Sequence, residues 1–141
     1  MSLTQKQSEM LETVRKYVRN YPFSVFCIAL VWVLSLTPFI PETPLSHVRL
    51  IDKWTHLVMY GGTSLVIWWE YRRQHRRPDY RRLLLWGLLA PALMGGLLEL
   101  LQKYATTTRS GEWLDAVADA VGALLGSTLG LLLLHVGKTG R

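Results

Sequence analysis

Polar residues that could perform chemistry lie close to the ends of three long apolar stretches of the chain. An ionised side chain at the centre of a lipid bilayer costs roughly 2.5–3.5 kcal/mol, so such groups persist where they are paired or used. A histidine among carboxylates could act as a general base, as a nucleophile or as part of a binding pocket for a polar ligand. The residues concerned are Asp52, Lys53, His56 and Tyr60, then Glu99 and Gln102, and finally Asp115 and Asp119.

Four apolar segments must position these residues, and each is predicted to form a membrane-spanning helix. A span needs about 20 apolar residues to cross ~30 Å of hydrocarbon. The segments lack a polar face along most of their length, which argues against four buried helices of a soluble protein. We therefore expect an all-α fold, an integral membrane bundle of four transmembrane helices over residues 22–40, 54–69, 83–101 and 113–136.

The basic residues predict the orientation of this bundle. Twelve of the 16 Lys and Arg residues lie in the N-terminal segment, in the loop after the second span or in the C-terminal tail. Cytoplasmic loops of membrane proteins carry such an excess, so both termini are expected in the cytoplasm. We expect residues 1–21 to form an amphipathic or loosely ordered cytoplasmic segment, 22–136 the membrane domain and 137–141 a cytoplasmic tail. The net charge of +6 is therefore explained by membrane topology, and we do not expect nucleic acid as a partner.

In this topology the polar residues share one layer at the outer side of the membrane. Asp52, His56 and Tyr60 follow one helical stripe, and Asp115 and Asp119 continue into a stripe of glycines, since residues four apart share a helix face. Small residues at this spacing let helices approach closely. The glycines expected at helix contacts, which would also allow a homodimer, are Gly95, Gly96, Gly122, Gly126 and Gly130.

We expect this layer to form an outward-facing polar pocket, although internal ion pairs could satisfy the same residues without any ligand. Candidate catalytic residues are His56, Glu99 and Asp115. No metal or other cofactor is expected, because one histidine is few for zinc and the chain has no His-x-x-x-His pair. The predicted ligand-binding residues are Asp52, Lys53, His56, Tyr60, Glu99, Gln102, Arg109, Asp115 and Asp119.

At these residues the chain resembles the VanZ-like family of bacterial multipass membrane proteins. The resemblance runs from Ser35-Leu36-Thr37-Pro38 through Asp52-Lys53-x-x-His56-x-x-x-Tyr60 and Gly96-x-x-Glu99-x-x-Gln102 to Arg109 and Asp115-x-x-x-Asp119-x-x-Gly122-x-x-x-Gly126. The family commonly has Asn where this chain has Asp119, so ligand preference is open at that position. The resemblance implies an envelope protein related to one associated with resistance to teicoplanin, and it implies no established reaction.

Three functions follow from these expectations. The first is a module that binds membrane lipids, a lipid-linked cell-wall precursor or a lipoglycopeptide, and so modulates glycopeptide susceptibility. The second is a membrane enzyme that acts on a lipid-linked precursor through His56 and neighbouring acids. The third is a small transporter or flippase. It is the least favoured, because the acids are confined to one side of the membrane whereas transport relays usually continue across it. An enzyme ranks below a binding module because no Ser or Cys of the layer is paired with a base.

Overall fold

The computed structural model describes residues 2–37, 44, 50–107 and 112–139, and these residues are organised in helices. In chain order the helices are α1 (Leu3–Asn20), α2 (Pro22–Leu36), α3 (Ile51–Gln74), α4 (Tyr80–Leu83), the π-helical segment η1 (Leu84–Leu89), α5 (Ala90–Ala105) and α6 (Trp113–Thr139). The α4, η1 and α5 segments form one continuous helix from Tyr80 to Ala105. The expectation of an all-helical chain is confirmed for the described residues.

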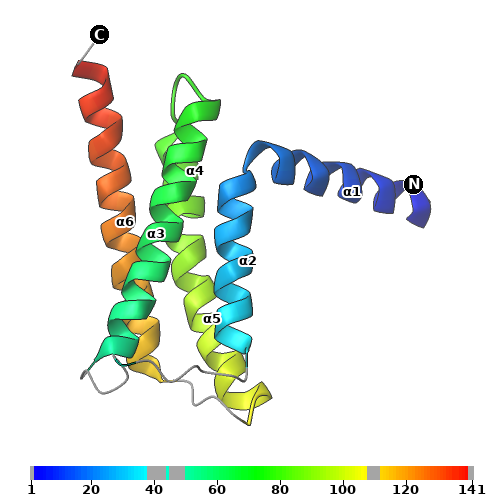
Figure 1. Ribbon diagram of the computed structural model, residues 1–141. Helices are drawn as coiled ribbons and strands as arrows, with labels where there is room; N and C mark the ends of the chain where they lie inside the picture. Colours follow the sequence, from blue (N-terminus) through cyan, green and yellow to red (C-terminus); the bar gives the residue numbers. More distant parts are fainter. Residues whose placement is uncertain (1, 38–43, 45–49, 108–111, 140–141) are drawn as a thin grey trace.

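Helices α2, α3, α4–α5 and α6 stand side by side and alternate in direction (Figure 1). As a result, α1 and the C-terminal end of α6 lie at the same end of the bundle, and the cluster of candidate residues lies at the other. Two apolar clusters form the core. One contains Val31, Tyr60 and Leu98, and the second contains Trp68, Leu83 and Leu134.

Helix α1 projects away from the bundle (Figure 1), at an angle of 101° to α2. It has no buried residue. Met10, Val14 and Tyr17 share one side of this helix because they are three and four residues apart, and all three are exposed. An exposed apolar side on a cationic helix is typical of segments that lie in a membrane surface. The predicted amphipathic character of residues 1–21 agrees with this helix.

Helices α3 and α6 approach each other closely along most of their length because glycines line their contact. A Cβ atom at Gly122 would clash with the carbonyl oxygen of Leu57, and one at Gly126 with that of Gly61. One turn further, a Cβ at Gly130 would lie 2.6 Å from the Cβ of Trp68. These contacts place backbone against backbone, as small residues allow in membrane helices.

Pro91 leaves a backbone carbonyl without its helical donor, and a neighbouring helix supplies a replacement. Proline has no N–H, so the carbonyl of Gly87, four residues earlier, cannot receive the usual hydrogen bond. The Ser127 hydroxyl on α6 donates to that carbonyl at 3.0 Å, and the Trp68 indole N–H on α3 donates to the same hydroxyl at 3.1 Å. This network joins three helices in the middle of the bundle, where water could not satisfy the carbonyl.

Glu70 comes at the end of an apolar run and just before two arginines, an order in which an acid ordinarily pairs with an arginine at the membrane surface. Its side chain is instead buried and accepts hydrogen bonds from the backbone N–H groups of Phe23 at 3.0 Å and Ser24 at 2.8 Å. The Ser24 hydroxyl donates to it as well, at 2.5 Å. The first N–H groups of a helix have no intrahelical partner, and the helix dipole favours a negative charge there. Glu70 on α3 therefore caps the N-terminus of α2.

Two helices of the described chain, Tyr80–Ala105 and Trp113–Gly137, are long and apolar enough to cross a membrane. The bent pair of α1 and α2 would make a third if it were counted as one span. Helix α3 carries charged residues at both ends, and α2 is described over 15 residues only. The prediction of a membrane protein is thus supported, whereas the full set of four spans remains an expectation.

Candidate functional site

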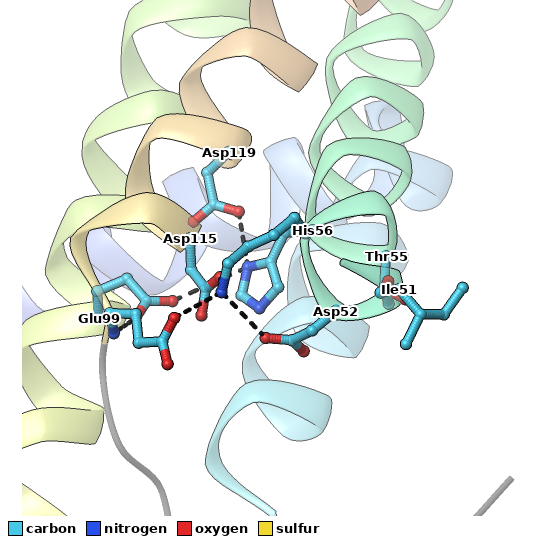
Figure 2. A network of polar contacts seen from close by, with 9 residues as sticks. Ile51, Asp52, Thr55, His56, Glu99, Asp115 and Asp119 are labelled. Atoms are coloured by element: carbon cyan, nitrogen blue, oxygen red, sulfur yellow. Dashed lines mark hydrogen bonds and ion pairs between the residues drawn. The ribbon is translucent and has the colours of Figure 1, made fainter. Parts of the chain in front are cut away.

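Three helices bring ionisable side chains together at the end of the bundle opposite the chain termini (Figure 2). Their spacing in the sequence explains this, because residues three or four apart point to the same side of a helix. Helices α3 and α6 each present such a pair, α5 contributes one acid, and the backbone before α6 adds another. We refer to the resulting seven residues as the charged cluster: Asp52, Lys53 and His56 of α3, Glu99 of α5, Glu112, and Asp115 and Asp119 of α6.

The deeper part of the charged cluster is an aspartate–histidine pair. Nδ1 of His56 lies 2.8 Å from Oδ1 of Asp119, and 3.9 Å from Oε1 of Glu99. Because a carboxylate accepts hydrogen bonds, the shorter contact places a proton on Nδ1. Asp119 has only 1% of its surface exposed, which makes it the most deeply buried acid of the bundle. The other carboxylate oxygen of Glu99 accepts a hydrogen bond from the backbone N–H of Glu112 at 2.9 Å.

The outer part of the charged cluster is organised by Lys53. Its ammonium group forms an ion pair with Asp115, contacts Glu112 at 2.7 Å and lies 3.7 Å from Asp52. A lysine near the end of a membrane helix ordinarily extends to the membrane surface. The Lys53 side chain is only 20% exposed and points toward the acids instead. The physical reason is Asp115, whose side chain is 6% exposed and which would otherwise be a buried unpaired charge.

Three predicted ligand-binding residues lie apart from the centre of the charged cluster. The Gln102 amide donates to the Ser35 carbonyl at 2.6 Å, and so ties α5 to the end of α2. The Tyr60 ring is buried in the apolar core. Asp52 is at the exposed edge, with 61% of its side chain accessible. The predicted contribution of Arg109 lies outside the described residues.

The predicted packing glycines divide into three groups. Gly95 faces the site, because a Cβ there would lie 2.5 Å from Oδ2 of Asp119. The α6 glycines are covered by α3 of the same chain, which leaves that face unavailable to a second copy. Gly96 makes no close helix contact, since a Cβ there would meet no described atom within 4 Å. Among the described residues Gly96 instead faces a groove, and close packing at this position stays a prediction.

A groove of about 430 Å³ runs between the end of α5 and the start of α6. Its lining is largely apolar, and Leu100, Trp113 and Leu114 expose their side chains at its edges. The charged residues of its lining are Glu99, Lys103 and Glu112. Glu99 therefore connects the groove to the buried pair of His56 and Asp119. Such a combination of apolar walls and a few polar groups is typical of ligand sites.

Sequence analysis assigned no role to two acidic residues that join helices in the structure. Glu70 caps α2, and Glu112 belongs to the charged cluster. Glu70 stands at the end of an apolar run beside arginines, where a surface ion pair is the ordinary arrangement. Glu112 is followed directly by Trp113, the first residue of α6, and acids favour the start of a helix. That position was a usable signal, whereas nothing local indicated that Glu70 caps another helix.

The fold and the site together define an all-helical membrane protein with a buried charged cluster at one end of its bundle. Comparisons with protein-family models, with curated proteins and with solved structures found no match to this chain. Its function is therefore argued from the site itself.

Proposed function

We propose that the protein is a four-span membrane protein of the bacterial envelope that binds the polar head of an amphiphile. Two helices meet the length and apolarity of a span, and α2 and α3 stand beside them in the same bundle (Figure 1). At 1.5 Å of rise per residue, the 24 residues of α3 extend about 36 Å, enough for a bilayer core. Because α2 packs against α3 and α5, it occupies the same slab.

The distribution of basic residues supports an orientation with both termini in the cytoplasm. The Arg-rich segment between α3 and α4 lies at the same end of the bundle as the termini (Figure 1). Positive charge is retained on the cytoplasmic side, so the charged cluster faces the outside of the inner membrane. Exposed apolar residues of α1 would then rest in the inner surface, with its lysines and arginines near anionic lipid heads.

The groove between α5 and α6 is the observation that carries the proposal. It opens beside exposed apolar side chains, where a lipid tail can lie in the bilayer, and its floor contains the buried carboxylate of Glu99. Lys53 and Gln102 are already engaged within the chain. They do not line the groove, whose charged residues are Glu99, Lys103 and Glu112. Two acids against one lysine favour a head group rich in hydroxyl or amine donors.

Lipid-linked cell-wall precursors and lipoglycopeptides both present sugar hydroxyls beside an apolar tail. The resemblance to VanZ-like proteins favours the same class of ligand, and with it an effect on teicoplanin susceptibility. This part of the proposal rests on the resemblance, and the groove supports it by size, polarity and position.

Filling the groove tests the proposal. A leucine at position 96 would project into the groove without meeting described atoms at its Cβ. Gly62→Leu is the matched control, because its Cβ also meets no described atom within 4 Å and Gly62 does not line the groove. We expect Gly96→Leu to lower the amount of amphiphile that copurifies from bacterial membranes at least tenfold, as measured by mass spectrometry of extracted lipids. Equal lipid profiles for the two variants, both folded, would refute the proposal.

A second candidate function, a membrane enzyme, is favoured by the pair of His56 and Asp119. A carboxylate that holds Nδ1–H directs the other ring nitrogen, Nε2, to act as a base. The 2.8 Å contact has this geometry. The distinguishing measurement is the turnover of the copurified amphiphile over time, for the parent protein and for His56→Gln. Turnover that survives this substitution would exclude His56 as the base.

A further inference from the structure

The buried end of the charged cluster has the donor set of a metal site, which the spacing of these residues in the sequence did not predict. His56, Glu99 and Asp119 come from three different helices, yet each offers one ligand atom, and these atoms all lie within 4.8 Å of one another. All three residues are buried, with 8%, 6% and 1% of their surface exposed. A site assembled across helices lacks the short-range spacing that marks most zinc motifs.

An unpartnered oxygen points to a ligand at this position. Oδ1 of Asp119 contacts the His56 ring, whereas Oδ2 is buried without any hydrogen-bond partner among the described residues. Figure 2 shows the Asp119 carboxylate directed at His56 from the neighbouring helix. A buried polar atom without a partner costs about 1–3 kcal/mol, and more when it is charged. Gly95 keeps the space beside Oδ2 open, because any side chain there would meet this oxygen.

The charges of the cluster also favour a bound cation. Among the described residues, the charged cluster contains five carboxylates, whereas Lys53 and His56 are its basic groups. Lys53 is bound to the outer acids, so Glu99 and Asp119 share one imidazole. Two carboxylates near one ring in a low-dielectric interior repel each other, and a bound divalent ion would remove this repulsion.

We propose that His56, Glu99 and Asp119 bind one divalent transition-metal ion of the zinc type. Imidazole and carboxylate donors suit zinc, and three protein ligands leave a fourth position open. Tetrahedral coordination at bond lengths near 2.1 Å separates neighbouring ligand atoms by about 3.4 Å. The ion would displace the proton that Nδ1 of His56 otherwise donates to Asp119, because only a deprotonated ring nitrogen binds a metal. Nδ1 lies 2.8 Å from Asp119 and 3.9 Å from Glu99, so side-chain shifts of a few tenths of an ångström would bring both carboxylates to the required separation from it.

An ion at this position would alter the ligand preference of the neighbouring groove, a consequence that rests on the proposed function. Glu99 belongs both to the donor set and to the lining of the groove. With the ion bound, the charges of Glu99 and Asp119 are neutralised, so the floor of the groove loses its net negative charge. The open coordination position would then accept a phosphate or hydroxyl oxygen from a head group.

Metal binding is tested with the full-length protein in lipid nanodiscs, purified without a polyhistidine tag and stripped with EDTA. The three other histidines, His47, His75 and His135, are replaced by glutamine so that only His56 remains. Titration calorimetry with Zn²⁺ should give one equivalent with a Kd in the micromolar range or tighter, and Co²⁺ should give visible bands of tetrahedral coordination. Ca²⁺, which prefers six to eight oxygen ligands, should bind at least tenfold more weakly.

Asp119→Asn should weaken Zn²⁺ binding at least tenfold, and Glu99→Gln is a second variant if the first does not fold. Asp79→Asn is the matched control, because Asp79 lies between α3 and α4 at the opposite end of the bundle and should leave the affinity unchanged. Equal Zn²⁺ affinity in Asp119→Asn, Glu99→Gln and Asp79→Asn would overturn the inference. Retained lipid capture with no metal binding would refute this inference alone, whereas metal binding without lipid capture would refute the proposed function alone.

Discussion

Two adjacent glycines of α5 allow a sharp test of how the buried pair of His56 and Asp119 is held. A Cβ at Gly95 would lie 2.5 Å from Oδ2, 2.7 Å from Cβ and 2.9 Å from Cγ of Asp119. A Cβ at Gly96 would meet no described atom within 4 Å. The two positions share a helix, a residue type and a neighbourhood in the sequence. Gly95→Ala and Gly96→Ala therefore differ chiefly in whether the added methyl group meets Asp119.

The difference in stability between these variants follows from the clash alone. Both substitutions gain about 0.5–1 kcal/mol from the helix propensity of alanine, and this contribution cancels in the comparison. Moving Asp119 away at its own Cβ requires α5 and α6 to separate or the carboxylate to rotate. Overpacking of this kind costs about 1–3 kcal/mol, and loss of the hydrogen bond to His56 costs a similar amount. We expect Gly95→Ala to be less stable than Gly96→Ala by about 1–3 kcal/mol, or roughly 5- to 150-fold in the unfolding equilibrium.

The assay is reversible unfolding in mixed micelles by titration with SDS, followed by the helical circular dichroism signal. Equal slopes of the unfolding free energy against SDS would show that the two variants unfold in the same way. Zn²⁺ binding should also weaken in Gly95→Ala and remain in Gly96→Ala if the metal inference holds. Equal stability of Gly95→Ala and Gly96→Ala would show that α6 does not place Asp119 against α5 as described, and would refute the reasoning.

Two further predictions concern hydrogen bonds that join helices away from the site. Glu70→Gln removes charge and acceptor capacity from the buried start of α2, so the free energy of unfolding should fall by about 1–3 kcal/mol. The control, Glu12→Gln on exposed α1, should leave it unchanged. Equal SDS unfolding midpoints for the two variants would contradict the capping role of Glu70. Ser127→Ala should lower the free energy of unfolding by about 0.6–1.7 kcal/mol, because the Trp68 N–H and the Gly87 carbonyl lose their shared partner. Thr128→Ala is the control, since it loses only a hydrogen bond within its own helix. Equal losses for the two variants would refute the bridging role of Ser127.

Much of the helical architecture was predictable because it depends on local patterns of apolar residues. Long apolar stretches with glycine stripes indicated packed helices, and the stripe that begins at Asp119 correctly pointed to the bundle interior. A proline within a helix always frees a backbone carbonyl, but the choice of Ser127 as the partner of the carbonyl freed by Pro91 depends on helix packing. Gly95 and Gly96 looked equivalent in the sequence, since the direction of each Cβ matters only once a neighbouring helix is present.

The sequence by itself predicted that the chain is helical, that four apolar segments suit a membrane, and that His56, Glu99, Asp115 and Asp119 share one level of the bundle. The tertiary structure decided which of these residues meet. It paired His56 with Asp119 and Lys53 with Asp115, and it turned Glu70 toward the start of α2. The physical reason is that periodicity sets which side of a helix a residue occupies, whereas the rotation and separation of neighbouring helices set its partner.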